Sequence, residues 1–265
     1  IAAFNLGIKV GHVEAGLRSG NPRNPFPEEM NRRLISRLAD LHFAATRQNR
    51  ETLLVEGVPS KNIAVTGNPV VDSLLFFAKT AKPNPDLAKM LDMTKGSRRI
   101  LLTTHRRESF GKTMEGNLKV LRDFIASRPD TSLFFPVHLN PNVRKVTKEV
   151  LGGAERIFLL EPLGYSDFIA LIQGSWLIVS DSGGVQEEAP SLGKPLLVIR
   201  ANTERPEAIE AGVAKLVGSS SKSLKRHLEE VNGDETWIRS VKKQKNPFGD
   251  GKAAERIASF IQRKI

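Results

Sequence analysis

The stretch WLIVSDSGGVQEEAPSLGKP, residues 176–195, contains the pattern that decides the fold. A short apolar run, WLIVS, ends in the polar turn DSGG, and a helical pattern follows directly. A strand that leads through a glycine turn into a helix is typical of an open parallel sheet, in which ligands bind at the carboxyl ends of the strands. Backbone N–H groups at the beginning of such a helix favour an anion. We therefore expect a phosphate to bind at Ser182, Gly183 and Gly184.

The carboxylates that follow this turn need a role of their own, because they repel an anion. Glu188 lies four residues beyond Gly184, about one helical turn along, where it can accept hydrogen bonds from a ribose while the turn holds a diphosphate. We expect Glu187 to point away into solvent. The glycine spacing excludes a Walker phosphate loop. The alternative interpretation is an ordinary strand–helix turn with a Ser or Asp cap.

Apolar runs and amphipathic stretches alternate along most of the chain. The runs that predict strands are residues 8–14, 41–46, 62–67, 98–104, 131–138, 156–162, 176–182 and 195–200. The stretches that predict helices are residues 27–38, 47–56, 70–80, 114–126, 143–151, 166–173, 185–191 and 221–231. Nearly continuous apolar strands that alternate with helices are typical of parallel sheets covered on both faces. The sequence therefore predicts an α/β fold.

The alternation is interrupted at residues 80–99, where two prolines and several charges predict a linker. Three predicted strands precede this segment and five follow it, so we expect the remainder of one Rossmann-like domain and then a complete one. The expected division is 1–72 for the first domain, 73–98 for the connection, 99–247 for the second domain and 248–265 for a helix that returns to the first.

The composition limits the class of protein and of ligand. The chain has 265 residues, of which 40% are hydrophobic, no cysteine, and no apolar run long enough to span a membrane. We therefore expect a soluble protein of the reducing cytoplasm. The formal net charge of +11 attracts anions. Because the basic residues are dispersed among acids and aromatic residues make up only 6%, a phosphate-bearing small molecule is favoured over nucleic acid.

A second polar cluster, THRRES, follows another predicted strand. His105, Arg106 and Arg107 would stand at the ligand-binding edge of the sheet, where a histidine can do acid–base or phosphate chemistry. The alternative is a structural histidine. Arg205, ahead of Pro206 at a helix start, can clamp a phosphate or be an ordinary surface arginine.

Two carboxylates early in the chain complete a candidate acid–base set. Glu14 ends a predicted strand, where its side chain would face a ligand crevice. Glu28 follows Pro27 in a first helical turn, where a carboxylate also stabilises the helix dipole without any functional role. Taken with Glu14 and His105, we interpret Glu28 as a member of an acid–base set. His138 ends a further predicted strand. No cluster has metal-ligand spacing, so no metal is expected.

Eight short motifs occur in the order and approximate spacing of one enzyme family. They are HVEAGLR, PEEMNRR, TGNPVVD, THRRES, PVHLNP, SDSGGVQEEAPSLGKP, RANTERPEA and NPFGDGKA, and they run from Gly11 to the C-terminal helix. In these motifs the chain closely resembles the non-hydrolysing UDP-N-acetylglucosamine 2-epimerases. Relatives that act on diacetamido-uronic acid sugars look different around HVEAGLR, so the simple N-acetylglucosamine substrate is preferred.

The resemblance implies a GT-B fold, in which two Rossmann-like domains hold a UDP-sugar in a cleft, and a homodimer. It implies inversion at C2 of UDP-N-acetylglucosamine to give UDP-N-acetylmannosamine, for polysaccharide biosynthesis. UDP is eliminated to leave a 2-acetamidoglucal and is then added back. No cofactor, nucleic-acid partner or membrane partner is implied.

The resemblance also implies roles for individual residues. Glu14 and Glu28 match the acid–base and charge-stabilising carboxylates, and His105 matches the histidine beside the diphosphate. The matching nucleotide-binding positions are Phe168, Ser182, Gly183, Gly184, Glu188 and Arg205. Arg106 and His138 match positions that, in bacterial members, help to form an allosteric pocket for a second UDP-N-acetylglucosamine.

Two departures from the family bear on these expectations. Family members carry a long segment upstream of HVEAG with a basic loop and a catalytic aspartate, so we expect a fragment or processed form whose own activity is open. Leu163 stands where some relatives have a glutamine that contacts uracil. The alternatives are a GT-B glycosyltransferase, a hydrolysing epimerase, and a catalytically inactive UDP-sugar-binding module.

Overall fold

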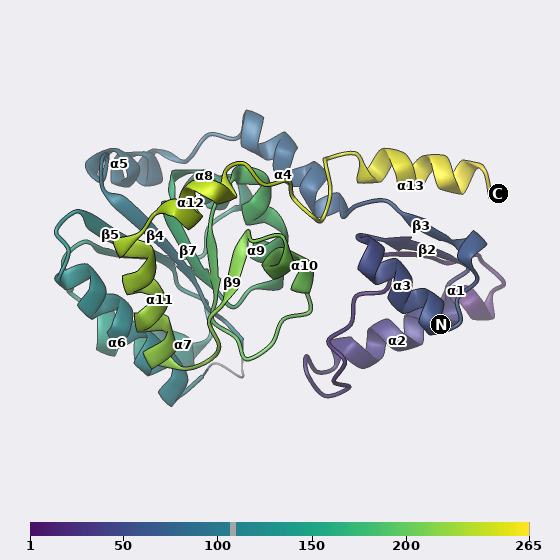
Figure 1. Cartoon of the computed structure of the whole chain (residues 1–265), viewed down its shortest axis with the longest axis horizontal. Coiled ribbons are helices and arrows are strands. Elements are labelled where there is room, and N and C mark those ends of the chain that lie inside the picture. Colours follow the sequence, from purple (N-terminus) through teal and green to yellow (C-terminus); the bar gives the residue numbers. More distant parts are fainter. Residues whose placement is uncertain (107–109, 265) are drawn as a thin grey trace. The chain divides into compact units, whose positions relative to one another are not determined.

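The computed structural model describes residues 1–106 and 110–264, which form two compact units (Figure 1). The first unit contains Ile1–Leu75, Thr203–Glu207 and Asn246–Ile265. The second contains Phe76–Asn202 and Ala208–Lys245. Each unit has its own parallel sheet with helices, so the expected α/β class is confirmed. The domain boundaries expected from the sequence stay a prediction.

The sheet of the second unit has six strands in the order β6-β5-β4-β7-β8-β9, all parallel. The strands are β4 (Arg98–Thr103), β5 (Thr131–Pro136), β6 (Ile157–Leu160), β7 (Leu177–Ser180), β8 (Leu196–Val198) and β9 (Ala214–Leu216). β5 and β6 extend the sheet beyond β4, whereas β8 and β9 extend it beyond β7. The strand order therefore reverses between β4 and β7, which is where open α/β sheets bind their ligands.

Helices connect these strands, because parallel neighbours need a crossover that returns the chain to the same edge of the sheet. The connections are α6 (Lys112–Ala126), α7 (Pro141–Leu151), α8 (Tyr165–Gly174), α9 (Gly183–Glu188) with the 3₁₀ turn η3 (Ala189–Leu192), and α10 (Pro206–Glu210). α5 (Pro85–Met93) precedes β4, and α11 (Ser221–Gly233) and α12 (Thr236–Val241) follow β9. α6 packs against α7 and α11 over buried apolar side chains of β4, β5 and β7. α8 packs against α5 and β4.

The sheet of the first unit has three parallel strands in the order β1-β2-β3. They are β1 (Gly11–Val13), β2 (Leu41–Ala44) and β3 (Ile63–Val65), with α1 (Ala2–Asn5), α2 (Glu28–Leu38), α3 (Arg47–Val55), η1 (Ser60–Asn62) and α13 (Ala253–Gln262). α4 (Pro69–Thr80) begins in this unit, and its residues from Phe76 onward belong to the second. The backbone N–H groups of Ala253 and Ala254 donate to the Asp72 carboxylate at 3.1 and 2.8 Å. The ring of Phe260 lies edge-on to Phe43 at 5.9 Å. The last helix is therefore part of the first unit.

Several features of the second unit differ from the sequence-based expectation. α5 lies inside the segment expected to be a linker, because Pro85 occupies its first turn and Asn84 caps it. β9 was not expected, because it is only three residues long and its apolar stretch, residues 213–217, is interrupted by Lys215. The helix expected over 185–191 ends as α9 at Glu188 and continues as η3, where Pro190 cannot donate a backbone hydrogen bond.

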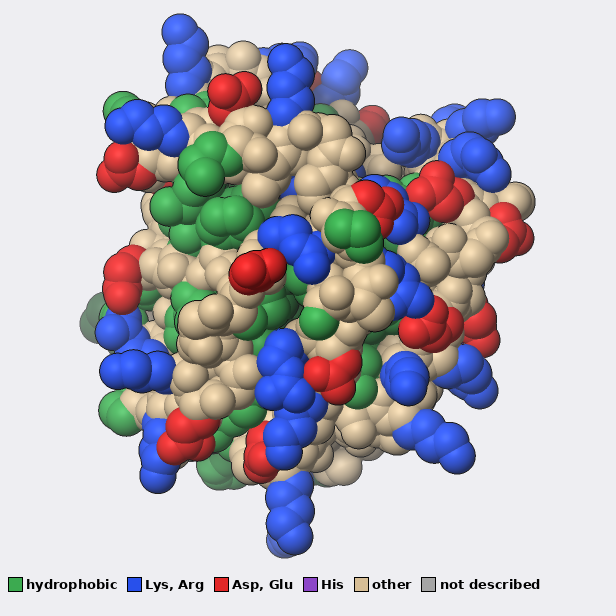
Figure 2. Space-filling view, turned by 90° about the vertical axis from the view of Figure 1, so that its left-hand side faces the viewer, with side chains coloured by type: hydrophobic (Ala, Val, Ile, Leu, Met, Phe, Trp, Pro, Cys, Tyr) green, Lys and Arg blue, Asp and Glu red, His purple; other side chains and the backbone are tan. Residues whose placement is uncertain are grey.

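Of the helices described, none combines the length and the apolar character that a membrane span requires. Figure 2 shows one face of the molecule, on which Lys and Arg side chains are interspersed with Asp and Glu. Among the same described residues, no group of three or more His, Asp or Glu side chains is arranged to hold a metal ion.

Candidate functional site

Two polar turns meet at the carboxyl ends of β4 and β7. β4 ends at Thr103 and leads into His105, while β7 ends at Ser180 and leads into Asp181. These strands are hydrogen-bonded neighbours, and the hydroxyls of Thr103 and Ser180 lie 2.5 Å apart. The two turns that stood out in the sequence are therefore side by side at the point where the strand order reverses.

Asp181 is fully buried and holds the turn that carries His105. Its carboxylate accepts hydrogen bonds from the Thr104 hydroxyl at 2.8 Å, from the His105 N–H at 3.2 Å and from the Arg106 N–H at 3.1 Å. The Arg106 guanidinium donates to the Asp181 carbonyl oxygen at 3.0 Å. A buried carboxylate needs such donors because its charge has lost water. Asp181 thereby fixes the backbone from which the His105 ring projects.

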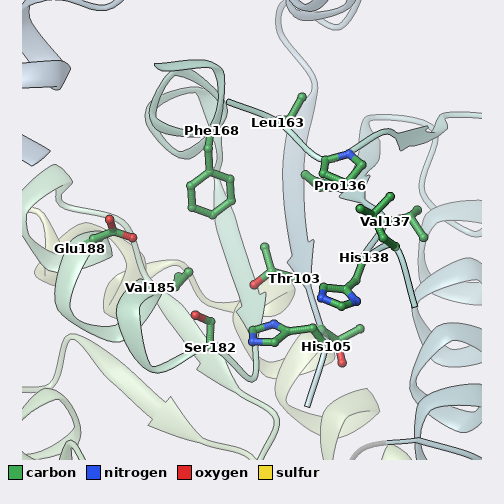
Figure 3. Close-up of a pocket in the computed structure, with 13 residues that line it drawn as sticks. Thr103, His105, Pro136, Val137, His138, Leu163, Phe168, Ser182, Val185 and Glu188 are labelled. Carbon is green, nitrogen blue, oxygen red and sulfur yellow. The ribbon is translucent and has the colours of Figure 1, made fainter. Parts of the chain in front are cut away.

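A pocket of about 410 Å³ opens over these turns (Figure 3). Its apolar wall is formed by Pro136, Val137, Leu139, Pro162, Leu163, Phe168 and Val185, and its polar groups come from Thr103, Thr104, His105, His138, Ser182 and Glu188. In Figure 3, Phe168 and Ser182 lie between Glu188 on one side and the two histidines on the other. An apolar wall with a few placed polar groups is typical of a small-molecule site.

The two histidines of the pocket form a stacked pair. The ring centroids of His105 and His138 are 5.7 Å apart and the ring planes differ by 22°. The Asn140 N–H donates to Nδ1 of His138 at 3.1 Å, which leaves Nε2 as its second polar atom. Nδ1 of His105 lies 3.5 Å from Oδ1 of Asp181, and 43% of the His105 side chain is exposed. Both rings can therefore exchange hydrogen bonds with a ligand in the pocket.

Glu188 is the buried acid of the pocket, with 6% of its surface exposed. The hydroxyl of Tyr165 donates to Oε1 of Glu188 at 2.8 Å. Burial raises the pKa of Glu188, and the hydrogen bond from Tyr165 lowers it. Glu187, expected to be solvated, is instead only 3% exposed, so that expectation was wrong. Its place on the inner side of α9 removes it from solvent.

The start of α9 offers backbone to a ligand. α9 begins at Gly183 with Ser182 as its N-cap residue. Apart from the chain neighbours of Gly184 and the backbone of its own helix, the only described atom that a Cβ at Gly184 would meet within 4 Å is the Ser182 hydroxyl oxygen, at 3.9 Å. This open approach lets an anion come close to the N–H groups at the helix start.

In the first unit, the carboxylate expected at the end of a strand is held by two polar side chains. Glu14 directly follows β1, and its φ of +61° is a conformation that residues other than glycine seldom adopt. Nη2 of Arg205 lies 3.3 Å from Oε1 of Glu14, and Nδ2 of Asn68 lies 3.4 Å from the same oxygen. A strained carboxylate with defined partners is a frequent feature of functional sites.

The acids at the start of α2 have different environments. Glu28 is exposed, as a catalytic carboxylate or a helix-dipole acid would be. Glu29 is fully buried and accepts hydrogen bonds from the Ser19 N–H at 2.9 Å and from Arg33 at 2.9 Å. Glu29 is therefore the structural member of the pair.

The pocket of the second unit brings together five of the expected site residues, His105, His138, Phe168, Ser182 and Glu188. Leu163 lines the same pocket and makes that part of its wall apolar. Arg106 lies beside it, bonded to Asp181. Glu14, Glu28 and Arg205 belong to the first unit. Arg107 lies outside the described residues.

Sequence reasoning missed three residues that hold these groups. From the sequence, Asp181 is assigned no role beyond the turn, although a carboxylate at the end of a predicted strand is the signal that singles out Glu14. Tyr165 is the only tyrosine of the chain, which is a weak signal. Asn68 stood inside a quoted motif without an assigned role.

Comparison with known proteins places this arrangement in one family. A model of the family described as UDP-N-acetylglucosamine 2-epimerase matches residues 1–262. The putative UDP-N-acetylglucosamine 2-epimerase of Thermotoga maritima is 47% identical over 262 residues, which cover 98% of this chain and 69% of that protein. The UDP-N-acetylglucosamine 2-epimerase of Salmonella typhimurium is 43% identical over 267 residues, covering 99% of this chain and 71% of the relative.

Solved structures agree with this match. The Staphylococcus aureus MnaA–UDP structure superposes with a TM-score of 0.95 at 43% identity and covers 99% of this chain and 71% of its own. The structure of the Neisseria meningitidis UDP-GlcNAc 2-epimerase bound to UDP-GlcNAc superposes with a TM-score of 0.92 at 40% identity. The match covers 99% of this chain and 72% of that one. These likenesses confirm the expected GT-B type of α/β fold. The motifs, the pocket residues and the similarity along nearly the whole of this chain agree, and the chain belongs to the UDP-N-acetylglucosamine 2-epimerase family.

Proposed function

We propose that this chain binds UDP-N-acetylglucosamine and inverts its C2 centre to give UDP-N-acetylmannosamine without net hydrolysis. The observation that carries the proposal is the family match over residues 1–262, with relatives of that name more than 40% identical. Structures of relatives with UDP and with UDP-GlcNAc support a UDP-sugar as the ligand.

We assign the nucleotide to the pocket of the second unit. Phe168 presents an aromatic face to the uracil, and Glu188 accepts hydrogen bonds from the ribose hydroxyls. Ser182, Gly183 and Gly184 offer a hydroxyl and backbone N–H groups to the diphosphate. Arg205 is assigned as a further phosphate contact, and the net charge of +11 favours such an anion over a neutral sugar.

The chemistry has to make an unactivated C2–H bond acidic. Cleavage of the C1–O bond, with the electron pair leaving on UDP, develops positive charge at C1. Loss of the C2 proton to a base then forms the C1–C2 double bond of a 2-acetamidoglucal. In the second half of the reaction UDP adds back to C1, and a proton is delivered to the opposite face of C2. Carboxylates near C1 lower the barrier because they stabilise the developing charge.

Three residues are assigned to these steps. Glu14 and Glu28 act as the acid–base and charge-stabilising carboxylates. His105 lies beside the diphosphate and stabilises it as it leaves. The hydrogen bonds that the turn of His105 donates to the Asp181 carboxylate support this role, because a departing group needs a fixed partner.

Further expectations from the sequence extend the proposal. We infer a homodimer that serves polysaccharide biosynthesis in the cytoplasm, without metal or other cofactor. Arg106 and His138 are proposed to help form a regulatory pocket for a second UDP-N-acetylglucosamine.

The test is an NMR assay of the purified chain with UDP-N-acetylglucosamine in D₂O. We expect UDP-N-acetylmannosamine to appear with deuterium at C2, because the abstracted proton exchanges with solvent before it is returned. Free N-acetylmannosamine with UDP would instead identify a hydrolysing enzyme. Binding of UDP with no turnover and no exchange at C2 would identify a binding module.

Variants link turnover to the assigned residues. Glu14→Gln and His105→Ala are each expected to lower the rate by roughly 100-fold or more while the fold is retained. Glu115→Gln, which removes a half-exposed carboxylate of α6 that pairs with Lys119, is the matched control and should keep the full rate. Wild-type rates in both site variants would remove the assignment.

A further inference from the structure

Tyr165 connects the two helices that supply Phe168 and Glu188 to the pocket. It is the first residue of α8, and Phe168 lies three residues further along the same helix. Glu188 is the last residue of α9. The Tyr165 hydroxyl donates to Oε1 of Glu188 at 2.8 Å. Tyr165 is not one of the residues that line the pocket, so it acts on the pocket through Glu188.

The phenol ring of Tyr165 is itself held in place. Phe77 packs edge-on against it, with ring centroids 5.0 Å apart and planes at 86°. Two residues along α8, the Asp167 carboxylate accepts hydrogen bonds from the backbone N–H and the side-chain amide of Asn84, both at 2.7 Å. The start of α8 is thus anchored, and the hydroxyl of Tyr165 has little freedom to leave Glu188.

The ionisation states of Tyr165 and Glu188 favour Tyr165 as the hydrogen-bond donor and Glu188 as the acceptor. Burial and the neighbouring carboxylate raise the pKa of Tyr165, so its hydroxyl remains a donor. Burial raises the pKa of Glu188, and the bond from Tyr165 opposes that rise. A hydrogen bond to an ionised acceptor is stronger than one between neutral groups. Tyr165 therefore favours the ionised form of Glu188 and engages only one of its two oxygens.

We propose that Tyr165 is a positioning residue that holds the Glu188 carboxylate in one orientation, with Oε1 bound and Oε2 presented to the sugar hydroxyls of a bound nucleotide. The identity of the nucleotide rests on the proposed function, whereas the role of Tyr165 toward Glu188 does not. A carboxylate that is oriented and ionised before the ligand arrives binds hydroxyl groups without losing further side-chain freedom.

The first test is the dissociation constant of UDP, measured by calorimetry between pH 5.5 and 8.5 on the wild-type chain and on Tyr165→Phe. The variant keeps the ring and its contact with Phe77 and loses only the hydroxyl. We expect UDP to bind about tenfold more weakly at pH 7, the loss of one hydrogen bond to a charged group. The loss should grow as the pH falls, because the variant's Glu188 takes up a proton at higher pH. Equal weakening at every pH would overturn the proposal, since a merely structural effect has no such dependence.

Two further variants separate Tyr165 from the general packing of α8. In a Glu188→Gln background, Tyr165→Phe should have no additional effect on UDP binding, because the charged acceptor is gone. A full additional loss in that background would overturn the proposal. Gln173→Ala, which removes the α8 hydrogen bond to the Ala78 carbonyl oxygen, is the matched control and should bind UDP as the wild type does.

A second measurement needs no ligand. Carbon-13 NMR of the glutamate carboxyl groups in the free chain follows the titration of Glu188, assigned from the signal that Glu188→Gln removes. Tyr165→Phe is expected to raise the pKa of Glu188. An unchanged titration midpoint would overturn the role of Tyr165. If the wild-type chain does not bind UDP, the proposed function fails, while this titration still decides the role of Tyr165.

Discussion

At the scale of single residues, His12 and His42 show how burial sets the protonation state of a histidine in the first unit. The two residues pair in register on β1 and β2, and their rings meet edge-on with centroids 6.3 Å apart. Burial, followed by the proximity of His42, Arg18 and Arg32, lowers the pKa of His12 to about 4. Burial also lowers the pKa of His42. Both rings are therefore neutral in the folded unit at neutral pH.

This predicts that the first unit loses stability as the pH falls from about 6.5 toward 4. In the unfolded chain His12 takes up a proton near pH 6.5, whereas in the folded unit it does so only near pH 4. The unfolded state then binds more protons, so the free energy of unfolding falls with decreasing pH, by at most about 1.4 kcal/mol per pH unit for one such group. Hydrogen exchange of β1 and β2, followed by mass spectrometry and corrected for the intrinsic pH dependence, measures this directly.

His12→Asn removes one of these groups and should flatten the pH dependence of exchange in the first unit. His138→Asn, which removes an exposed histidine of the other unit, serves as the control. A wild-type slope in His12→Asn would show that other groups cause the acid sensitivity.

At the scale of elements, α5 shows that the prolines and polar residues that predict a linker can also begin a helix. The Asn84 side chain accepts a hydrogen bond from the Leu87 N–H at 2.9 Å, and Pro85 has no N–H to leave unpaired in the first turn. The same asparagine donates its amide to Asp167 at the start of α8. Leu87 is buried. One cap therefore starts α5 and ties it to the helix beside the pocket.

Asn84→Ala is accordingly expected to destabilise the second unit by about 1–2 kcal/mol, since both the cap and the bond to Asp167 are lost. Asn140→Ala is the matched variant, because Asn140 caps α7 through the Asn142 N–H at 2.9 Å, and it should cost about 0.5–1 kcal/mol. Urea unfolding followed by tryptophan fluorescence reports on this unit, which contains both Trp176 and Trp237. Equal costs for the two variants would show that the Asp167 bond adds nothing.

At the scale of the whole molecule, the net charge of +11 opposes the association of two copies of the chain. Two copies of such a chain repel each other, and dissolved salt weakens this repulsion at distances beyond about 10 Å at 0.1 M. Large apolar side chains are exposed in the first unit, among them Phe26, Met30 and Leu34. Exposed apolar surface of this kind favours association.

The expected homodimer should therefore have a mass of twice 29.2 kDa, and its dissociation constant should fall as salt is added. Sedimentation equilibrium at about 20 mM and 300 mM salt measures both quantities. A mass of 29.2 kDa at every salt concentration would exclude the dimer for this chain.

Local patterns in the sequence determined which segments form strands or helices and at which end of each strand the polar residues lie. Each predicted strand of the second unit overlaps an observed one, because near-continuous apolar runs are buried on both faces of a parallel sheet. The positions of His105 and Ser182 followed from the same patterns, since each lies two residues beyond a strand, and that of Glu188 followed from the helical pattern after the second of these strands. These signals are local, and they can be read without knowing which strands are neighbours.

Only the tertiary structure decided which of these residues meet. His105 and Asp181 are 76 residues apart and touch because β4 pairs with β7. Tyr165 reaches Glu188 because α8 packs against η3, the turn into which α9 continues, and Glu187 is buried on the same short helix. Strand order and helix packing depend on how all apolar faces are buried together, and no local periodicity encodes that choice.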